Sequence, residues 1–132
     1  MHTTISDMNN IMCAVSTTIL VIDDDPDILK TLKHMLECSN YTVDSACCEK
    51  EALSIIEKKH INIVLSDYNL GTDNGLDLLE KIRKQKPEIK TILMSGAFCP
   101  NETDMHRIDD FLSKPFDLHK LRSTINKTLN KE

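Results

Sequence analysis

The sequence has no excess of positive charge. Sixteen Lys and Arg residues stand against 21 Asp and Glu residues, which gives a formal net charge of -5 at pH 7. Proteins that bind nucleic acid over an extended surface carry basic patches that neutralise phosphates. The charge balance therefore argues against direct nucleic-acid binding.

Long hydrophobic runs are also missing. The longest apolar stretch, residues 11–22, is interrupted by three hydroxyl side chains, and a transmembrane helix needs about 20 apolar residues. A secretory signal has a basic segment before its apolar one, whereas residues 1–10 contain neither Lys nor Arg. We therefore expect a cytoplasmic protein with no membrane partner.

The five cysteines form no C-x-x-C pair, and their number is odd. This pattern argues against a zinc knuckle and against a disulfide framework. Cys47 and Cys48 are adjacent, but Lys50 is the only basic residue beside them. Packed or inert thiols are therefore favoured over a redox sensor.

What the sequence does contain is enough for one domain. A chain of 132 residues accommodates a single hydrophobic core and leaves no room for a second domain of ordinary size. Residues 1–16 show no convincing period, and we interpret them as a loosely held N-terminal extension. The folded domain is expected to cover residues 17–132.

Short apolar runs alternate with stretches of helical period from residue 18 onward, the pattern of βαβ units around a parallel sheet. The expected strands are residues 19–22, 41–44, 61–65, 91–94 and 108–112. Helical periods run through residues 28–36, 49–58, 78–82 and 118–129. The second strand alternates apolar and polar residues, which favours an edge position. The sequence thus predicts a single α/β domain with a five-stranded parallel sheet.

Polar side chains follow these strands. The first strand precedes Asp23, Asp24 and Asp25, and the third, fourth and fifth precede Asp67, Ser95 and Lys114. Ligands of open parallel α/β sheets bind beyond the carboxyl ends of the strands. The carboxylates of Asp23, Asp24 and Asp67, a hydroxyl and an ammonium are therefore expected at one edge of the sheet. Asp25 is expected to cap the helix that follows the first strand.

The carboxylates of this group need a cation. Asp23 and Asp24 are expected to gather with Asp67, and like charges about 4 Å apart cost about 4 kcal/mol per pair at an effective dielectric near 20. Mg²⁺ prefers such oxygen ligands. A carboxylate beside Mg²⁺ and the Lys114 ammonium can attack a phosphoryl group and hold it as an acyl phosphate.

Four segments, in this order, resemble the receiver domain of two-component response regulators. They are the acidic pair in residues 21–26, the phosphoacceptor segment in 65–70, the hydroxyl switch in 94–97 and the Lys-Pro segment in 112–116. The resemblance covers residues 18–131. It implies a flavodoxin-like, doubly wound (βα)5 domain with strand order 2-1-3-4-5.

The same resemblance implies the composition of a magnesium site. Asp67 would be the phosphoacceptor and, together with Asp23, Asp24 and the backbone carbonyl of Asn69, would hold Mg²⁺.

Three further roles follow from the resemblance. Lys114 would pair with the phosphoryl group, Ser95 would be the switch hydroxyl, and Phe111 would be the aromatic switch. A plain core position is the alternative for Phe111. The Lys114–Pro115 bond is expected to be cis.

Two departures from the family pattern stand out. Gly71 occupies a position where the family usually has Pro, whereas Gly75 matches the family's loop glycine. The segment from Gly96 to Ser113 is about one helical turn shorter than usual, which predicts a shortened fourth helix. In the family the fourth helix belongs to the usual partner and dimer face, so the resemblance does not predict that face for this chain.

The leading hypothesis is a phosphorylation-controlled switch rather than an enzyme acting on outside substrates. Asp67 would take phosphate from a sensor histidine kinase or a histidine phosphotransfer protein, and the altered surface would act on a downstream target. A homodimer on phosphorylation is a further expectation. The chain is either a free-standing receiver or a fragment of a larger response regulator or hybrid kinase.

Two other classes compete with this hypothesis. A metal-dependent phosphatase would use the same chemistry, but Asn69 stands where its second acid is needed. A degenerate receiver would bind its partner without phosphate, although this chain keeps all the site residues.

Overall fold

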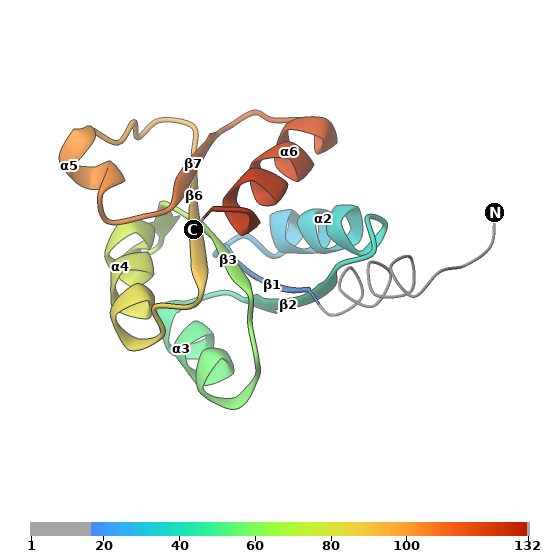
Figure 1. Cartoon of the computed structure of the whole chain (residues 1–132), viewed down its shortest axis with the longest axis horizontal. Coiled ribbons are helices and arrows are strands. Elements are labelled where there is room, and N and C mark those ends of the chain that lie inside the picture. The colour runs from blue at the N-terminus through green and yellow to red at the C-terminus, as the bar shows by residue number, and fades with distance from the viewer. Residues whose placement is uncertain (1–16, 132) are drawn as a thin grey trace.

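The computed structural model describes residues 17–131. The extension predicted for residues 1–16 lies outside the described residues, as does residue 132. A five-stranded parallel sheet forms the centre, and helices cover both of its faces (Figure 1). The strands of this sheet are β1 (Thr18–Ile22), β2 (Thr42–Ala46), β3 (Ile63–Asp67), β6 (Lys90–Ser95) and β7 (Asp110–Ser113). The helices are α2 (Pro26–Glu37), α3 (Glu49–Lys58), α4 (Gly75–Gln85), α5 (Glu102–Met105) and α6 (Leu118–Leu129).

The strand order is β2-β1-β3-β6-β7. Counted along the chain within this sheet, it is the predicted order 2-1-3-4-5, with the second strand at an edge as expected. The α/β doubly wound fold is therefore confirmed. None of the described helices has the length and apolar character needed to cross a membrane.

The core lies in two layers, one on each face of the sheet. Alternate residues of β1 point to opposite layers, so Leu20 packs with α3 and α4, whereas Ile19 packs with α2 and α6. Because both faces are covered, β1 is a continuous apolar run.

Four of the five strands extend further toward the functional edge than predicted from the sequence. The third strand ends at Asp67 rather than at residue 65, and the fourth ends at Ser95 rather than at residue 94. The second and fifth strands end at Ala46 and Ser113 rather than at residues 44 and 112. Asp67 pairs with Met94 and Ser95 pairs with Ser113 in the ladder. Backbone hydrogen bonding continues past the last apolar side chain because it does not depend on side-chain polarity.

Local signals at the helix starts behave as expected. Asp25 is the N-cap of α2, with its side chain accepting from the N–H of Asp27 at 2.9 Å and Pro26 in the first position. Helix α5 spans only Glu102–Met105, so the fourth helix of the fold is short, as predicted. None of its residues is buried, and a helix without an apolar face gains little from packing.

A small hairpin, β4 (Asn69–Leu70) and β5 (Asp73–Asn74), replaces the loop expected after the third strand. Its turn begins at Gly71, whose φ is 72°. Proline fixes φ near −65° and cannot adopt this conformation. The turn is therefore compatible with glycine at position 71 and incompatible with proline.

Candidate functional site

The carboxylates of Asp23, Asp24 and Asp67 meet at the carboxyl edge of the sheet. Ile22 of β1 pairs with Ser66 of β3, so the next residues of the two strands lie side by side. One oxygen atom from each of the three carboxylates lies within 4.8 Å of the others. Asp23 and Asp67 are buried, whereas Asp24 is exposed.

Lys114 joins this cluster from the end of β7. Its Nζ lies 2.7 Å from Asp67 Oδ1 and 3.6 Å from Asp23 Oδ2. Its backbone N–H donates to the carbonyl of Ser95 at 2.9 Å. The following Lys114–Pro115 peptide bond is cis, as the resemblance implied.

Burial and charge shift the pKa of two of these groups. Burial raises the pKa of Asp23; the backbone N–H of Asp25 opposes this increase and the charge of Asp67 adds to it. Burial alone would lower the pKa of Lys114, but its hydrogen bond to Asp67 and the neighbouring negative charges outweigh burial and raise it. Lys114 is therefore a stable positive charge beside an acid whose ionised form is disfavoured.

One atom of the cluster lacks a hydrogen-bond partner. Asp23 Oδ2 is the only buried side-chain oxygen or nitrogen among residues 17–131 in this condition, whereas Oδ1 accepts from the Asp25 N–H at 2.9 Å. A buried, unpartnered carboxylate oxygen costs free energy that a bound cation would offset. Three carboxylates with only oxygen donors are a suitable ligand set for Mg²⁺.

Asn69 and Gly75 hold the backbone around Asp67. The N–H of Asn69 donates to Asp67 Oδ2 at 3.2 Å. The N–H of Gly75 donates to the Tyr68 carbonyl at 2.7 Å, and a Cβ at Gly75 would lie 1.9 Å from the Asp67 carbonyl oxygen. The N-terminus of α4 therefore lies against the backbone of Asp67 at a distance that only glycine allows.

Ser95 lies on β6, the strand beside β3, and Phe111 lies on β7, the next strand of the sheet. Ser95 is buried, and its Oγ accepts from the N–H of Phe98 at 3.0 Å. Phe111 is partly buried and packs against the core layer that includes α3 and α4. The structure thus brings Ser95 and Lys114 to the acidic edge, while Phe111 contacts the core.

Comparison with known proteins identifies the family. Residues 19–126 match the model of the response regulator receiver domain. The chain belongs to this family. The likeness agrees with the acidic cluster and the sheet order described above.

Curated relatives contain the receiver domain within much longer chains. The sensor kinase CckA of Brucella abortus is 34% identical over 123 residues, which cover 89% of this chain and 13% of that kinase. The alginate biosynthesis transcriptional regulatory protein AlgB of Pseudomonas putida is 31% identical over 115 residues, which cover 84% of this chain and 25% of AlgB. The chain thus spans a quarter or less of the length of these relatives.

Solved receiver structures share the fold. The response regulator TrrA of Thermotoga maritima, crystallised in complex with Mg²⁺-BeF, has 29% identity and a TM-score of 0.78, covering 85% of this chain and 98% of TrrA. A CheY-like receiver domain protein of Methanospirillum hungatei has 31% identity and a TM-score of 0.78, covering 86% and 94% of the two chains.

Two aromatic residues of the receiver domain escaped the sequence analysis. Tyr68 and Phe98 stack with ring centroids 3.9 Å apart and planes 4° from parallel. Tyr68 directly follows Asp67, and Phe98 stands three residues after Ser95. Their positions beside two site residues were the only available signal.

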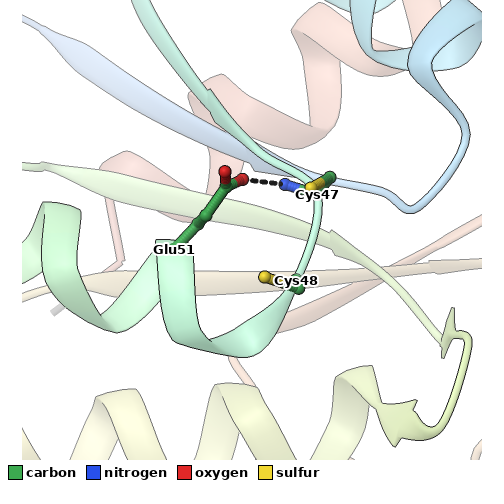
Figure 2. A group of neighbouring side chains, drawn as sticks. All are labelled: Cys47, Cys48 and Glu51. Carbon is green, nitrogen blue, oxygen red and sulfur yellow. Dashed lines mark hydrogen bonds between the residues drawn. The ribbon is translucent and has the colours of Figure 1, made fainter.

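A second group of potential metal ligands lies outside the acidic cluster. Cys47, Cys48 and Glu51 gather at the start of α3, with their ligand atoms within 4.8 Å of one another (Figure 2). Glu51, in the first turn of α3, accepts at 2.8 Å from the backbone N–H of Cys47, the residue before the N-cap Cys48. The Glu51 carboxylate, acting as a hydrogen-bond acceptor for the thiol, raises the pKa of Cys47. Since metal ligation and redox chemistry need the thiolate, a carboxylate beside the thiol favours the inert cysteines predicted from the sequence.

Replacing Glu51 by Gln should speed alkylation of Cys47 by iodoacetamide severalfold at neutral pH, because the neutral amide no longer disfavours the thiolate. Tandem mass spectrometry of the modified peptides measures the rate at each cysteine. The exposed Cys99 is the internal control and should react equally in both proteins. Unchanged alkylation of Cys47 would mean that Glu51 does not control this thiol.

Proposed function

We propose that Asp67 accepts a phosphoryl group from a sensor histidine kinase or a histidine phosphotransfer protein, and that the phosphate changes a protein-binding surface of the domain. The observation that carries this proposal is the position of Asp67, buried at a strand end with Lys114 Nζ at 2.7 Å and two further carboxylates beside it. A receiver domain is a phosphoacceptor rather than a turnover enzyme.

Mg²⁺ would be held by the carboxylates of Asp23, Asp24 and Asp67 and by the backbone carbonyl of Asn69. Bound there, it supplies positive charge that stabilises the transferring phosphoryl group. The unpartnered Oδ2 of Asp23 supports this assignment. TrrA was crystallised in complex with Mg²⁺-BeF, and we extend that metal to this chain as part of the proposal.

The remaining steps belong to the side chains. A carboxylate oxygen of Asp67 attacks phosphorus, a P–O bond forms as the P–N bond of the donor phosphohistidine breaks, and the imidazole leaves. Lys114, whose Nζ already contacts Asp67, forms an ion pair with the phosphoryl oxygens once they carry the negative charge. Ser95 donates a hydrogen bond to one of these oxygens, and Phe111 repacks against the core in response.

An apolar groove beside the site supports a protein rather than a small molecule as the phosphodonor. It begins at Lys114 and runs between α2, represented by Ile28 and Met35, and the segment containing Pro115 and Phe116. A helix carrying the donor histidine could lie along this groove with its imidazole near Asp67. The changed surface would then bind a downstream target or a second copy of the chain.

The test is phosphorylation by acetyl phosphate, followed by intact mass. With Mg²⁺ the protein should gain one phosphate, and with EDTA it should gain none. Reduction with borohydride should convert the residue at position 67 to homoserine, and Asp67→Asn should stay unmodified. Asp44→Asn, which removes a carboxylate that pairs with Lys59, is the matched control and should be phosphorylated normally.

Absence of an adduct, in protein that binds Mg²⁺ but not beryllofluoride, would overturn the proposal and leave a phosphate-independent binding module. Sustained turnover of a small phosphate ester would instead support the phosphatase alternative.

A further inference from the structure

We propose that Tyr68 and Phe98 are positioning residues that hold the Ser95 hydroxyl on its own loop, so that their stacking sets how readily the site accepts a phosphoryl group. The inference rests on the proposed function, because it concerns the hydroxyl that would contact the phosphoryl group. Neither Tyr68 nor Phe98 is among the residues assigned to the site above.

The backbone of Ser95 is held in place by the sheet, so only its side chain is free to move when a phosphoryl group arrives. Ser95 is the last residue of β6, is 3% exposed and pairs with Ser113 of β7. Its carbonyl accepts from the N–H of Lys114 at 2.9 Å. The backbone is therefore held in the sheet, and redirecting the hydroxyl from its own loop toward a phosphoryl group on Asp67 requires rotation of the side chain.

Such a rotation breaks an existing hydrogen bond. Ser95 Oγ accepts from the backbone N–H of Phe98 at 3.0 Å. When the hydroxyl leaves, this partly buried N–H loses its acceptor, and an unpaired N–H in such a place is unfavourable. The segment of residues 96–101 must shift to expose the N–H to water or to another acceptor.

The aromatic stack opposes that shift. The Phe98 ring lies on the Tyr68 ring, with centroids 3.9 Å apart and planes 4° from parallel. Both rings are partly buried and pack against the same core layer. Movement of the backbone of Phe98 separates the two rings, so the stacking favours the arrangement in which Ser95 is bound to its own loop.

Tyr68 is the fixed side of the stack. Its N–H donates to the Met94 carbonyl at 2.8 Å, and its carbonyl accepts from the Gly75 N–H at 2.7 Å. Its hydroxyl accepts from Asn74 Nδ2 at 3.1 Å, and Asn74 is the N-cap of α4. Tyr68 is thus attached to β6 and α4, whereas residues 96–101 precede α5 without a helix or strand of their own. When the stack separates, the segment that carries Phe98 is therefore the part that moves.

The experiment measures beryllofluoride affinity in the presence of saturating Mg²⁺, by fluorine NMR. Phe98→Leu and Tyr68→Leu should each bind beryllofluoride roughly three- to tenfold more tightly than the wild type, because loss of the stack populates the state with a free Ser95 hydroxyl. Phe98→Tyr, which keeps a stacking ring, should bind like the wild type. Mg²⁺ affinity should not change in any of these variants, since neither Tyr68 nor Phe98 belongs to the proposed set of metal ligands.

The decisive comparison uses a Ser95→Ala background. If the rings act through Ser95, Phe98→Leu has no effect on beryllofluoride affinity once the hydroxyl is gone, whereas a general loosening of the fold would act in both backgrounds. Tyr41→Leu is the matched control, because Tyr41 is a partly buried aromatic packed against the opposite core layer. It should leave the affinity unchanged.

Unaltered or weaker binding in both leucine variants, or an equal effect with and without Ser95, would overturn the inference. Should either leucine variant prove unfolded by circular dichroism, the other leucine variant and Phe98→Tyr still decide the question. Failure of the wild type to bind beryllofluoride is a separate outcome that refutes the proposed function itself.

Discussion

Asp23→Asn is expected to reduce Mg²⁺ affinity roughly a thousandfold or more, because two unit charges about 4 Å apart interact with about 4 kcal/mol at an effective dielectric near 20 and each 1.4 kcal/mol is about tenfold. The same substitution should stabilise the metal-free domain by about 1 kcal/mol, as is common where a site trades stability for function. The reason is local. Asp23 Oδ2 is buried without a hydrogen-bond partner, whereas an Asn side chain would carry no charge and would still accept from the Asp25 N–H through Oδ1.

The stability gain should depend on pH. The folded-state pKa of Asp23 is raised above its ordinary value of 3.8, chiefly by burial. Below pH 3.8 the acid is protonated in both states, and its contribution to stability is fully present. As the pH rises from 3.8 through the raised pKa, the contribution is lost, because the unfolded chain releases the proton first. Asn does not titrate, so the advantage of the variant should grow across this interval and then level off.

Urea denaturation in EDTA at pH 4 and at pH 7 measures this advantage, and calorimetric titration measures Mg²⁺ affinity. Asp44→Asn is the control, because it removes the half-buried partner of Lys59 at 2.8 Å and should bring no gain in stability. A variant that is less stable than the wild type at pH 7 would mean that Lys114 compensates the buried charge of Asp23 fully.

Gly75→Ala is expected to destabilise the domain by about 3 kcal/mol, the upper part of the usual range for overpacking. The new Cβ would lie 1.9 Å from the carbonyl oxygen and 2.9 Å from the carbonyl carbon of Asp67. Both are backbone atoms of a central strand and cannot rotate away. Helix propensity alone would favour alanine by about 1 kcal/mol, so the sign of the effect separates the steric contact from propensity.

Chemical denaturation of Gly75→Ala and Gly96→Ala makes this comparison. A Cβ at Gly96 would meet its nearest neighbour, the Cβ of Lys114, at 3.6 Å, an ordinary contact. Gly96→Ala should therefore change stability far less than Gly75→Ala. Equal stability of the two variants would contradict the prediction, because it would show that the start of α4 can move away from Asp67. In that case Gly75→Ala should also accept phosphate normally.

Much of the site could be predicted because its signals are local. The buried run from Ile19 to Ile22 marks a covered strand whatever the rest of the chain does, and Asp23 follows it directly. Parallel strands end at the same edge of a sheet, so residues after separate strands are brought together without knowledge of any contact. Asp23, Asp24, Asp67, Ser95 and Lys114 were all located in this way, and the Asp25 cap depends only on its own neighbours.

Other features depend on contacts between segments far apart in the chain. Tyr68 and Phe98 are separated by 29 residues, and neither belongs to a periodic pattern, so only the folded loops bring their rings together. Asp23 and Asp24 have the same chemistry, yet one is buried and the other exposed, since the chain turns out of the sheet between them. The hairpin at Gly71 likewise depends on backbone pairing between Leu70 and Asp73.

The sequence by itself therefore determined the sheet, its order through family resemblance, and the set of polar groups at its edge, because apolar periodicity and strand ends are properties of short segments. Only the tertiary structure decided that Asp23 Oδ2 lacks a hydrogen-bond partner, that Gly75 lies against the Asp67 carbonyl and that the Phe98 N–H donates to the Ser95 hydroxyl. Each of these depends on the separation of atoms from different elements, which packing sets to within a few tenths of an ångström and which no local pattern encodes.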